Sequence, residues 1–293
     1  MFELLGVAPQ ALFAQLVVGL SSGAFYALLS LGLAVIFGML NVINFAHGAQ
    51  YMMGAFFSWM LLTYAGLPFW AALVLVPILV GAIGFAIEKL LLSRLYQVDQ
   101  LYGLLLTFGL ALIIEGLFRH QYGVSGLPYS NPLPGYLPLG FMNLPWYRAF
   151  AIGFSLTICF ATWFAIEKTK LGSYLRAATE KPELVQAFGI NVPRMLSLTY
   201  AFGVGLAGLA GVLAAPIYSV TPLMGSSLII VVFAVVVIGG MGSILGSILT
   251  GFGLGLLEGL TKVFYPPASN TVVFVVMVMV LLVRPQGLFG TSK

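Results

Sequence analysis

Long apolar stretches recur along almost the whole chain and limit what it can fold into. They cover residues 12–38, 49–66, 69–93, 101–119, 147–167, 195–218, 226–241, 243–260 and 270–284. Most are close to the ~20 residues with which a helix crosses about 30 Å of hydrocarbon. Because a backbone in lipid must satisfy its own hydrogen bonds, the stretches predict helices. We therefore expect an all-α polytopic membrane protein of about 8–10 transmembrane helices, with residues 1–293 forming one transmembrane domain.

Composition and charge exclude other classes of protein. Hydrophobic residues make up 61% of the chain and charged residues 7%, so a soluble core is a poor alternative. The formal net charge of +4 could suggest nucleic acid. However, the cations lie in loops between apolar stretches, where the positive-inside rule accounts for them. We expect contact with membrane lipids and no nucleic acid.

The central loop, residues 168–194, determines the predicted orientation. If it is cytoplasmic, alternation places most cations inside and few outside, which agrees with the positive-inside rule. The inside set is Lys89, Arg94, Lys168, Lys170, Arg176, Lys181, Arg194, Arg284 and Lys293, and the outside set is Arg119, Arg148 and Lys262. This orientation predicts about nine crossings, an external N-terminus and a cytoplasmic C-terminus. Residues 12–38 are long enough for one tilted helix or two short segments.

Two polar interruptions, one in each half of the chain, predict broken or short helices. NVINFAHG (residues 41–48) is either a polar turn at the cytoplasmic interface or a helix break near the translocation path, because Asn and His are costly in hydrocarbon. IGGMGSILGS (residues 238–247) clusters glycine and serine. Paired interruptions point to a transport path formed by discontinuous helices. The candidate pathway residues are Asn41, Asn44, Ser243 and Ser247.

Two pairs of charged side chains lie at helical spacing in or beside the apolar stretches. Glu115 and Arg119 lie at i and i+4, as do Glu258 and Lys262, and both pairs predict structural helical ion pairs. A proton relay is the alternative, but it would want a carboxylate near the middle of the bilayer. No metal site is expected, because His120 is the only other histidine in the sequence and no Cys or carboxylate is suitably spaced to complete a zinc site with His47.

Glycine and proline organise the remaining segments. Small residues at the spacing of Gly205, Gly208 and Gly211, and of Gly251, Gly255 and Gly259, predict closely packed helices in a bilayer. The external loop, residues 120–147, is rich in proline and cannot form a regular helix. Its aromatic residues suit the membrane surface or an external protein.

The central loop carries the signals of a short helix. Thr179 or Lys181 can cap it, Pro182 and Glu183 suit its first turn, and Gly189 can end it. Leu184, Val185 and Phe188 then give it an apolar side. Such a helix is suited to enter a groove on another protein, and the alternative is an amphipathic helix lying on the inner leaflet.

Residues 32–57, 176–195 and 236–259 resemble, in order and spacing, the integral-membrane permease subunit of branched-chain amino acid ABC importers. In that family the cytoplasmic loop carries a coupling helix that contacts the ATPase. The resemblance places the coupling contact at Glu180, Leu184, Ala187, Gly189 and Ile190. It also implies a second, similar permease, two ATP-binding subunits, a periplasmic binding protein and a location in the bacterial inner membrane.

The sequence independently indicates that an ATPase site must lie on another polypeptide. It contains no GxxxxGK[ST], so no phosphate-binding loop of that type is present. No catalytic constellation is seen, and no cofactor is expected. We expect a permease for leucine, isoleucine or valine that works by alternating access. The alternatives are a relative that carries urea, short amides or aromatic acids, and a stand-alone secondary transporter or channel.

Overall fold

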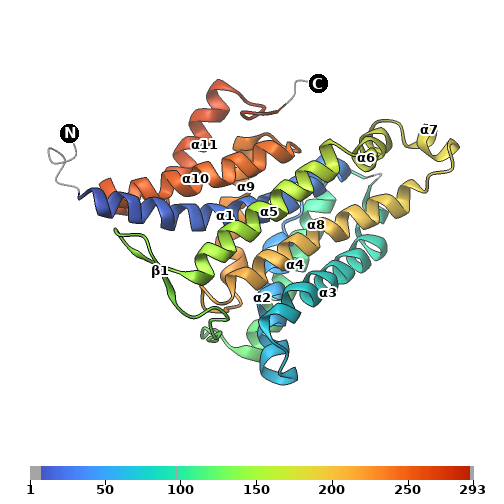
Figure 1. The fold of residues 1–293 in the computed structure, drawn as a ribbon. Coiled ribbons are helices and arrows are strands. Elements are labelled where there is room, and N and C mark those ends of the chain that lie inside the picture. The colour runs from blue at the N-terminus through green and yellow to red at the C-terminus, as the bar shows by residue number, and fades with distance from the viewer. Residues whose placement is uncertain (1–7, 97, 291–293) are drawn as a thin grey trace. The chain divides into compact units, whose positions relative to one another are not determined.

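The computed structural model describes residues 8–96 and 98–290, which are almost entirely helical (Figure 1). In chain order the α-helices are α1 (Pro9–Leu40), α2 (His47–Ala65), α3 (Phe69–Leu90), α4 (Gln100–Tyr122), α5 (Trp146–Glu167), α6 (Lys170–Glu180), α7 (Pro182–Ala187), α8 (Val192–Ala214), α9 (Met224–Gly239), α10 (Ile244–Phe264) and α11 (Val272–Val283). Two 3₁₀-helices, η2 (Leu92–Leu95) and η3 (Pro266–Ala268), follow α3 and α10. The predicted all-α class is confirmed.

Each predicted apolar stretch overlaps one α-helix. Within the described residues, six helical segments are long and apolar enough to cross a membrane, namely α1, α3 with η2, α4, α5, α8 and α10. The helices α9 and α11 are apolar but shorter. Of the two options for residues 12–38, the structure shows the single helix, because α1 runs unbroken for 32 residues, or about 48 Å. The prediction of about nine crossings stays a prediction.

The chain divides into two compact units. Unit 1 comprises residues 1–30, 131–159 and 231–293, and unit 2 comprises residues 31–130 and 160–230. The boundaries fall inside α1, α5 and α9, so neither unit is a continuous piece of chain.

In unit 2, glycine lets α8 lie against α2 and α3 at backbone distance. A methyl group at Gly54 of α2 would collide with the backbone of Gly208 in α8. A methyl group at Gly81 of α3 would lie 3.0 Å from the carbonyl oxygen of Ala201 in α8. The predicted close packing of this glycine-rich segment is confirmed, and α8 is the central helix of the unit.

In unit 1, a second glycine contact joins the first part of α1 to α10. A methyl group at Gly255 would collide with the backbone of Gly23, and one at Gly259 would lie 3.1 Å from the Cα atom of Gly19. Helices α9, α10 and α11 share an apolar core of Ala234, Val235, Ile238, Leu254 and Val273.

The proline-rich loop contains no helix between residues 123 and 145, as predicted. Strands β1 (Tyr136–Pro138) and β2 (Asn143–Pro145) form a short antiparallel hairpin in which Leu137 lies opposite Leu144. The proline in each strand lacks a backbone N–H donor, which limits how far the ladder can extend.

Candidate functional site

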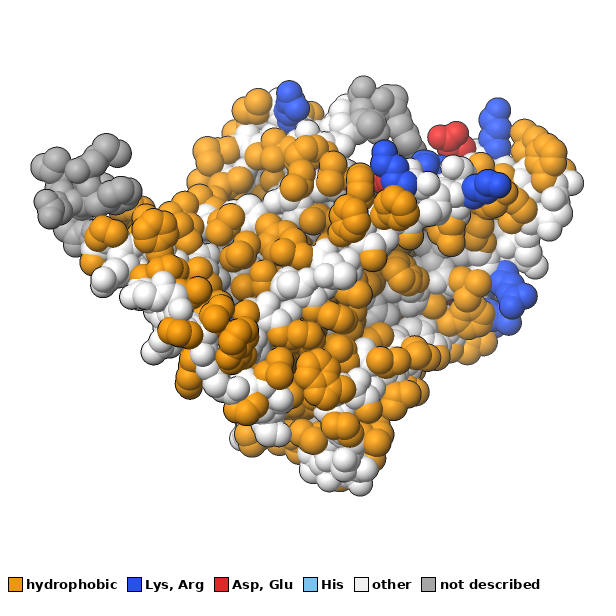
Figure 2. All heavy atoms as spheres, in the orientation of Figure 1, with side chains coloured by type: hydrophobic (Ala, Val, Ile, Leu, Met, Phe, Trp, Pro, Cys, Tyr) orange, Lys and Arg blue, Asp and Glu red, His pale blue; other side chains and the backbone are white. Residues whose placement is uncertain are grey.

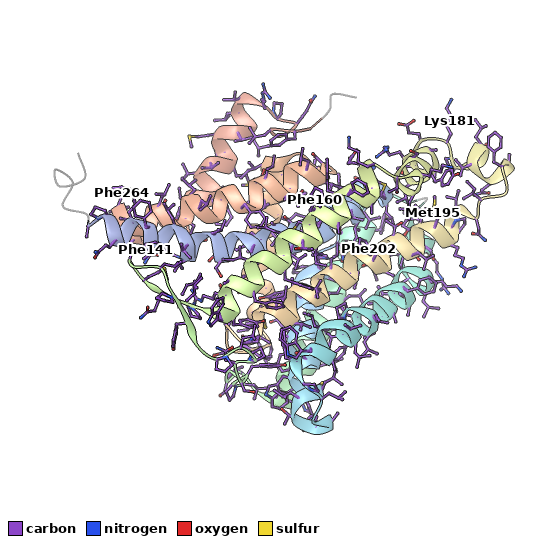
Figure 3. The ribbon with its side chains drawn as sticks, in the orientation of Figure 1. Phe141, Phe160, Lys181, Met195, Phe202 and Phe264 are labelled. Carbon is purple, nitrogen blue, oxygen red and sulfur yellow. The ribbon has the colours of Figure 1, made fainter. Side chains whose placement is uncertain are left out.

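The central loop of unit 2 folds into two short helices, α6 and α7, that lead directly into α8. Figure 3 shows Lys181 at the junction of α6 and α7, and Met195 near the beginning of α8. Helix α6 lies back against the end of α5, because a methyl group at Gly172 would collide with the carbonyl group of Ile166. Arg176 of α6 also pairs with Glu167 of α5 at 3.6 Å.

The beginning and end of α7 follow the sequence closely. Pro182 occupies the first turn with Glu183, and Gly189 has a φ of 84°, which suits a helix-ending glycine. Lys181 occupies the N-cap position, but no side chain caps the helix. Of the two predicted caps, the structure thus has Lys181, without a side-chain hydrogen bond. The Thr179 hydroxyl instead donates to the carbonyl oxygen of Leu175 at 2.8 Å and to that of Met39 at 3.4 Å.

The apolar side predicted for α7 is divided between two directions. Val185 is 7% exposed and packs with Ala178 of α6 and Val192 of α8. Leu184 and Phe188 are 52% and 79% exposed. Val185 therefore holds α7 to its neighbours, while the other two apolar side chains are available to a partner.

A cavity of about 390 Å³ opens between α6 and α7. It is lined by Tyr174, Ala177, Glu180, Lys181, Leu184, Val185, Phe188 and Ile190. Three of the predicted coupling residues, Glu180, Leu184 and Ile190, line this cavity. Ala187 and Gly189 are exposed on the same loop but do not line it.

Charged side chains surround the cavity. Figure 2 shows blue and red side chains gathered at the end of unit 2 that carries α6 and α7, whereas the long helices of that unit present orange surface. Residues 168–194 contain five Lys or Arg and two Glu. The exposed Arg176–Glu167 pair contributes little to stability, because solvent screens it. The loop is thus a positively charged surface around an apolar hollow.

The first predicted interruption is the turn between α1 and α2. Asn41 has a φ of 56°, a left-handed conformation that Asn tolerates better than most residues. Its carbonyl oxygen accepts a hydrogen bond from Gln100 Nε2 at 3.0 Å. Thr107 of α4 donates to the carbonyl oxygen of Ile43 and accepts from the Phe45 N–H at 3.1 Å. The turn is therefore held to α4 by polar side chains, and Asn41 itself is exposed.

Asn44 is buried in the same turn, and its Nδ2 donates to Oε1 of Gln50 in α2 at 3.0 Å. The Tyr200 hydroxyl of α8 lies beside the Gln50 amide. Glu88 of α3 lies in the same helix contact, because a methyl group on Gly84, one turn before Glu88, would collide with Val204, one turn after Tyr200. Glu88 is 1% exposed and accepts a hydrogen bond from Tyr96 at 2.6 Å. Asn44, Gln50, Glu88, Tyr96 and Tyr200 thus form a polar cluster within unit 2.

Tyr96 lies in the connection between α3 and α4, outside the spans. Burial, and then its hydrogen bond to Glu88, raise the pKa of Tyr96 above its ordinary value. Tyr96 therefore keeps its proton and remains a donor to the Glu88 carboxylate.

The second interruption, in unit 1, is a glycine turn followed by a helix cap. Gly240 and Gly242 have φ values of 99° and 85°. Ser243 Oγ accepts from the Gly246 N–H at 3.1 Å and caps α10. The buried Ser247 hydroxyl donates to the Ser243 carbonyl oxygen at 3.0 Å. Both serines thus have a local structural role, and a place for them on the pathway stays a prediction.

A family model described as "Branched-chain amino acid transport system / permease component" matches residues 15–283. The chain belongs to this permease family. It is 30% identical to the high-affinity branched-chain amino acid transport system permease protein BraD of Pseudomonas aeruginosa, over 95% of this chain and 96% of BraD. It is 28% identical to LivH of Escherichia coli K12, over the same shares, and 26% identical to LivM of that organism, over 92% of this chain and 68% of LivM. No solved structure matches it significantly.

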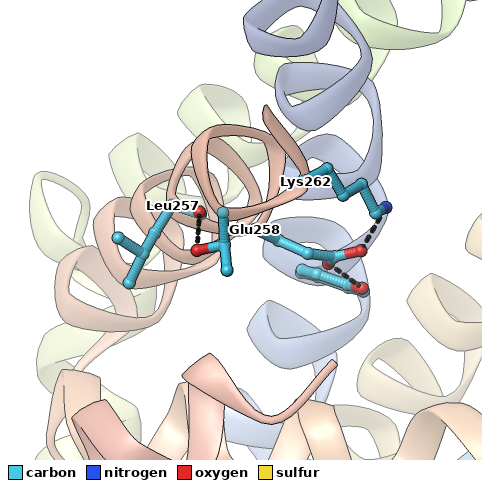
Figure 4. A network of polar contacts seen from close by, with 5 residues as sticks. Leu257, Glu258 and Lys262 are labelled. Atoms are coloured by element: carbon cyan, nitrogen blue, oxygen red, sulfur yellow. Dashed lines mark hydrogen bonds and ion pairs between the residues drawn. The ribbon is translucent and has the colours of Figure 1, made fainter. Parts of the chain in front are cut away.

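The two ion pairs predicted in the spans of this permease are confirmed. Arg119 lies 3.5 Å from Glu115, and Lys262 lies 2.6 Å from Glu258. Glu258 also accepts a hydrogen bond from the Tyr26 hydroxyl of α1 at 2.7 Å. Figure 4 shows the contacts of Glu258, which link α1 and α10 within unit 1. In residues 8–96 and 98–290, no group of three or more His, Cys, Asp or Glu side chains could hold a metal ion.

Sequence reasoning missed part of the site in this permease. Tyr174 and Ala177 line the cavity, and they begin a run continued by Lys181, Leu184 and Phe188 at alternating spacings of three and four. That run is the signal of one continuous face across α6 and α7. The buried Glu88 was also missed; its signal was a carboxylate next to Lys89 in the last turn of a largely apolar helix.

Proposed function

We propose that this permease is the transmembrane subunit of an ATP-driven importer that moves leucine, isoleucine or valine into the cytoplasm. The observation that carries the proposal is the cavity between α6 and α7, with Leu184 and Phe188 exposed on α7. An apolar hollow on a charged loop is suited to bury a partner's side chain. The partner that fits is an ATP-binding subunit, because the chain has no phosphate-binding loop.

A movement of α7 would reach the long helices through three contacts. Val185 packs with Val192 at the beginning of α8, and with Ala178 of α6. The Thr179 hydroxyl of α6 contacts the carbonyl oxygen of Met39 at the end of α1. Because α8 lies against α2 and α3 at backbone distance, a displacement of α8 would carry those helices with it.

The substrate and the other partners are supported by the names of the relatives. BraD, LivH and LivM are all named permease proteins of high-affinity branched-chain amino acid transport systems. The chain resembles both LivH and LivM of one organism, which supports a second, similar permease as a partner. The exposed apolar surface of α4, including Leu105, Leu112 and Leu117, is suited to contact that permease or lipid. Two ATP-binding subunits and an external solute-binding protein would complete the assembly.

The proposed location is the bacterial inner membrane, with the N-terminus outside and the C-terminus inside. The charges of residues 168–194 support this orientation, because a cytoplasmic loop is expected to carry an excess of Lys and Arg. The external loop, with its short β hairpin, then faces the solute-binding protein.

The test compares two exposed leucines of the central loop in the complete transporter. Leu184→Glu places a charge in the cavity, whereas Leu171→Glu places the same charge on α6 outside it, and the two leucines are 52% and 56% exposed. In proteoliposomes with the ATP-binding subunits and the binding protein, Leu184→Glu should abolish ATP-dependent uptake of labelled leucine. Leu171→Glu should retain it, and both variants should insert normally.

Equal uptake by the two variants would contradict the role given to the cavity. Uptake by the purified permease alone, driven by an ion gradient, would instead show the stand-alone transporter. Labelled urea, a short amide and an aromatic acid, offered with the cognate binding protein, distinguish the other substrates.

A further inference from the structure

Three polar atoms between α2, α3 and α8 have no hydrogen-bond partner in the part of the chain that the structure describes. They are Tyr200 Oη, Glu88 Oε2 and Gln50 Nε2. Their residues are at most 1% exposed. Buried polar groups in proteins are nearly always hydrogen-bonded, because an unmade bond in an apolar interior is costly. A cluster of such atoms within a membrane protein therefore needs an explanation.

The atoms are neighbours and are chemically complementary. Helices α3 and α8 touch at Gly84 and Val204, because a methyl group on Gly84 would collide with the Val204 side chain. The two helices run in opposite directions (Figure 1), so Glu88, one turn after Gly84, and Tyr200, one turn before Val204, lie at the same level. The Tyr200 hydroxyl also lies beside the Gln50 amide, although no hydrogen bond of normal geometry closes between them. The other carboxylate oxygen of Glu88 already accepts a hydrogen bond from Tyr96. Glu88 Oε2 is thus an acceptor without a donor, on the helix that faces a hydroxyl without an acceptor.

The helices that carry these atoms are connected differently to the central loop. Tyr200 lies on α8, which follows α7 after a short connection, and Val185 packs α7 onto the first residue of α8. Glu88 lies in the last turn of α3, which is followed by η2 and α4 and has no direct connection to the central loop. A small shift or rotation of α8 would therefore change the separation of Tyr200 and Glu88.

We propose that the Tyr200 hydroxyl donates a hydrogen bond to Glu88 Oε2 in a second conformation of the transport cycle. Tyr200 is then a positioning residue that holds α8 to α3 in that conformation. The proposal rests on the proposed function, because it takes α8 as the helix that the ATP-binding subunits move. A ligand-induced or ATP-induced change requires contacts that differ between the two conformations, and this pair is such a contact.

The test is Tyr200→Phe in the complete reconstituted transporter. In the conformation described, the hydroxyl makes no bond, so its removal should leave the midpoint of thermal unfolding unchanged or raise it. The loss of a bond to a carboxylate in the other conformation should lower the maximal rate of ATP-dependent uptake roughly tenfold, with half-saturation by the loaded binding protein unchanged.

Two control variants separate this role from a structural one. Ser155→Ala removes another fully buried hydroxyl without a described partner, in unit 1, and should leave uptake unchanged. Tyr96→Phe removes a hydroxyl that is bonded here, and should lower the unfolding midpoint.

The partner residue tests the pairing itself. Glu88→Leu should reduce uptake as Tyr200→Phe does, and the variant that carries both substitutions should lose no more uptake than the more affected single variant.

Uptake by Tyr200→Phe within twofold of the unchanged protein would overturn the proposal and indicate that buried water satisfies these atoms. A lowered unfolding midpoint with a matching loss of uptake would overturn it too, since that is a structural effect. If the unchanged complex itself takes up no solute with ATP, the proposed function has failed. Normal uptake with an unaffected Tyr200→Phe refutes the contact pair alone.

Discussion

Replacing Val185 by Ala should loosen α7 from the rest of unit 2. The side chain is 7% exposed and packs against Ala178 and Val192. The substitution removes two buried carbon groups, so the packing that holds α7 should weaken by about 1.6 kcal/mol. A helix of six residues cannot maintain itself without tertiary contacts, and the open form of α7 should therefore become roughly tenfold more populated.

Hydrogen exchange followed by mass spectrometry measures this opening directly. The Val185 N–H donates to the Lys181 carbonyl oxygen, and the Gly189 N–H donates to that of Gln186. Both amides should exchange roughly tenfold faster in Val185→Ala, since exchange follows the population of the open form. Amides in the middle of α8 should keep their rates. In proteoliposomes, leucine uptake should fall while the ATP-binding subunits still copurify.

Leu184→Ala is the matched control, because it shortens a neighbouring apolar side chain that is 52% exposed. Its exchange rates in α7 should stay within about twofold of the unchanged protein, since little buried surface is lost. The reasoning is refuted if Val185→Ala leaves the exchange of α7 unchanged, or if Leu184→Ala accelerates it equally.

Two further predictions concern glycine. Gly54→Ala should lower the midpoint of thermal unfolding in detergent, because the methyl group meets the backbone of Gly208 and overpacking costs about 1–3 kcal/mol; Gly109→Ala, whose methyl group meets nothing within 4 Å, should leave the midpoint unchanged or raise it. Gly189→Ala should reduce ATP-dependent uptake, because a φ of 84° costs an L-residue about 1–2 kcal/mol. Gly189→Asn should reduce uptake less. Equal uptake by the unchanged protein and both variants would argue against the end of α7 as a coupling element.

The longer helices could be predicted from the sequence because the signals for them are local. Bilayer thickness sets the length of an apolar run. The breaks near Asn41 and Gly240 occur at residue types that tolerate a left-handed backbone. The same holds for the limits of α7, where Pro182 favours a first turn and Gly189 favours an end. Membership of a permease family, too, was already visible in three sequence segments.

The burial of individual side chains around the site, and the directions in which they point, depended on tertiary structure. A helix of six residues turns too few times for its sequence to show which apolar side chain is inside. Val185 is buried because Ala178 of α6 and Val192 of α8, on the helices before and after α7, pack against it. The cavity and the burial of Glu88 likewise require helices to be brought together.

The sequence by itself thus determined that this is a helical membrane protein of a permease family, and where most of its helices begin and end. Only the tertiary structure decided which side chains of the central loop hold it to α8, which remain for a partner, and that Glu88 and Tyr200 lie buried near one another. The physical reason is range. Hydropathy and turn preferences act within a few residues, whereas burial depends on segments that meet in space.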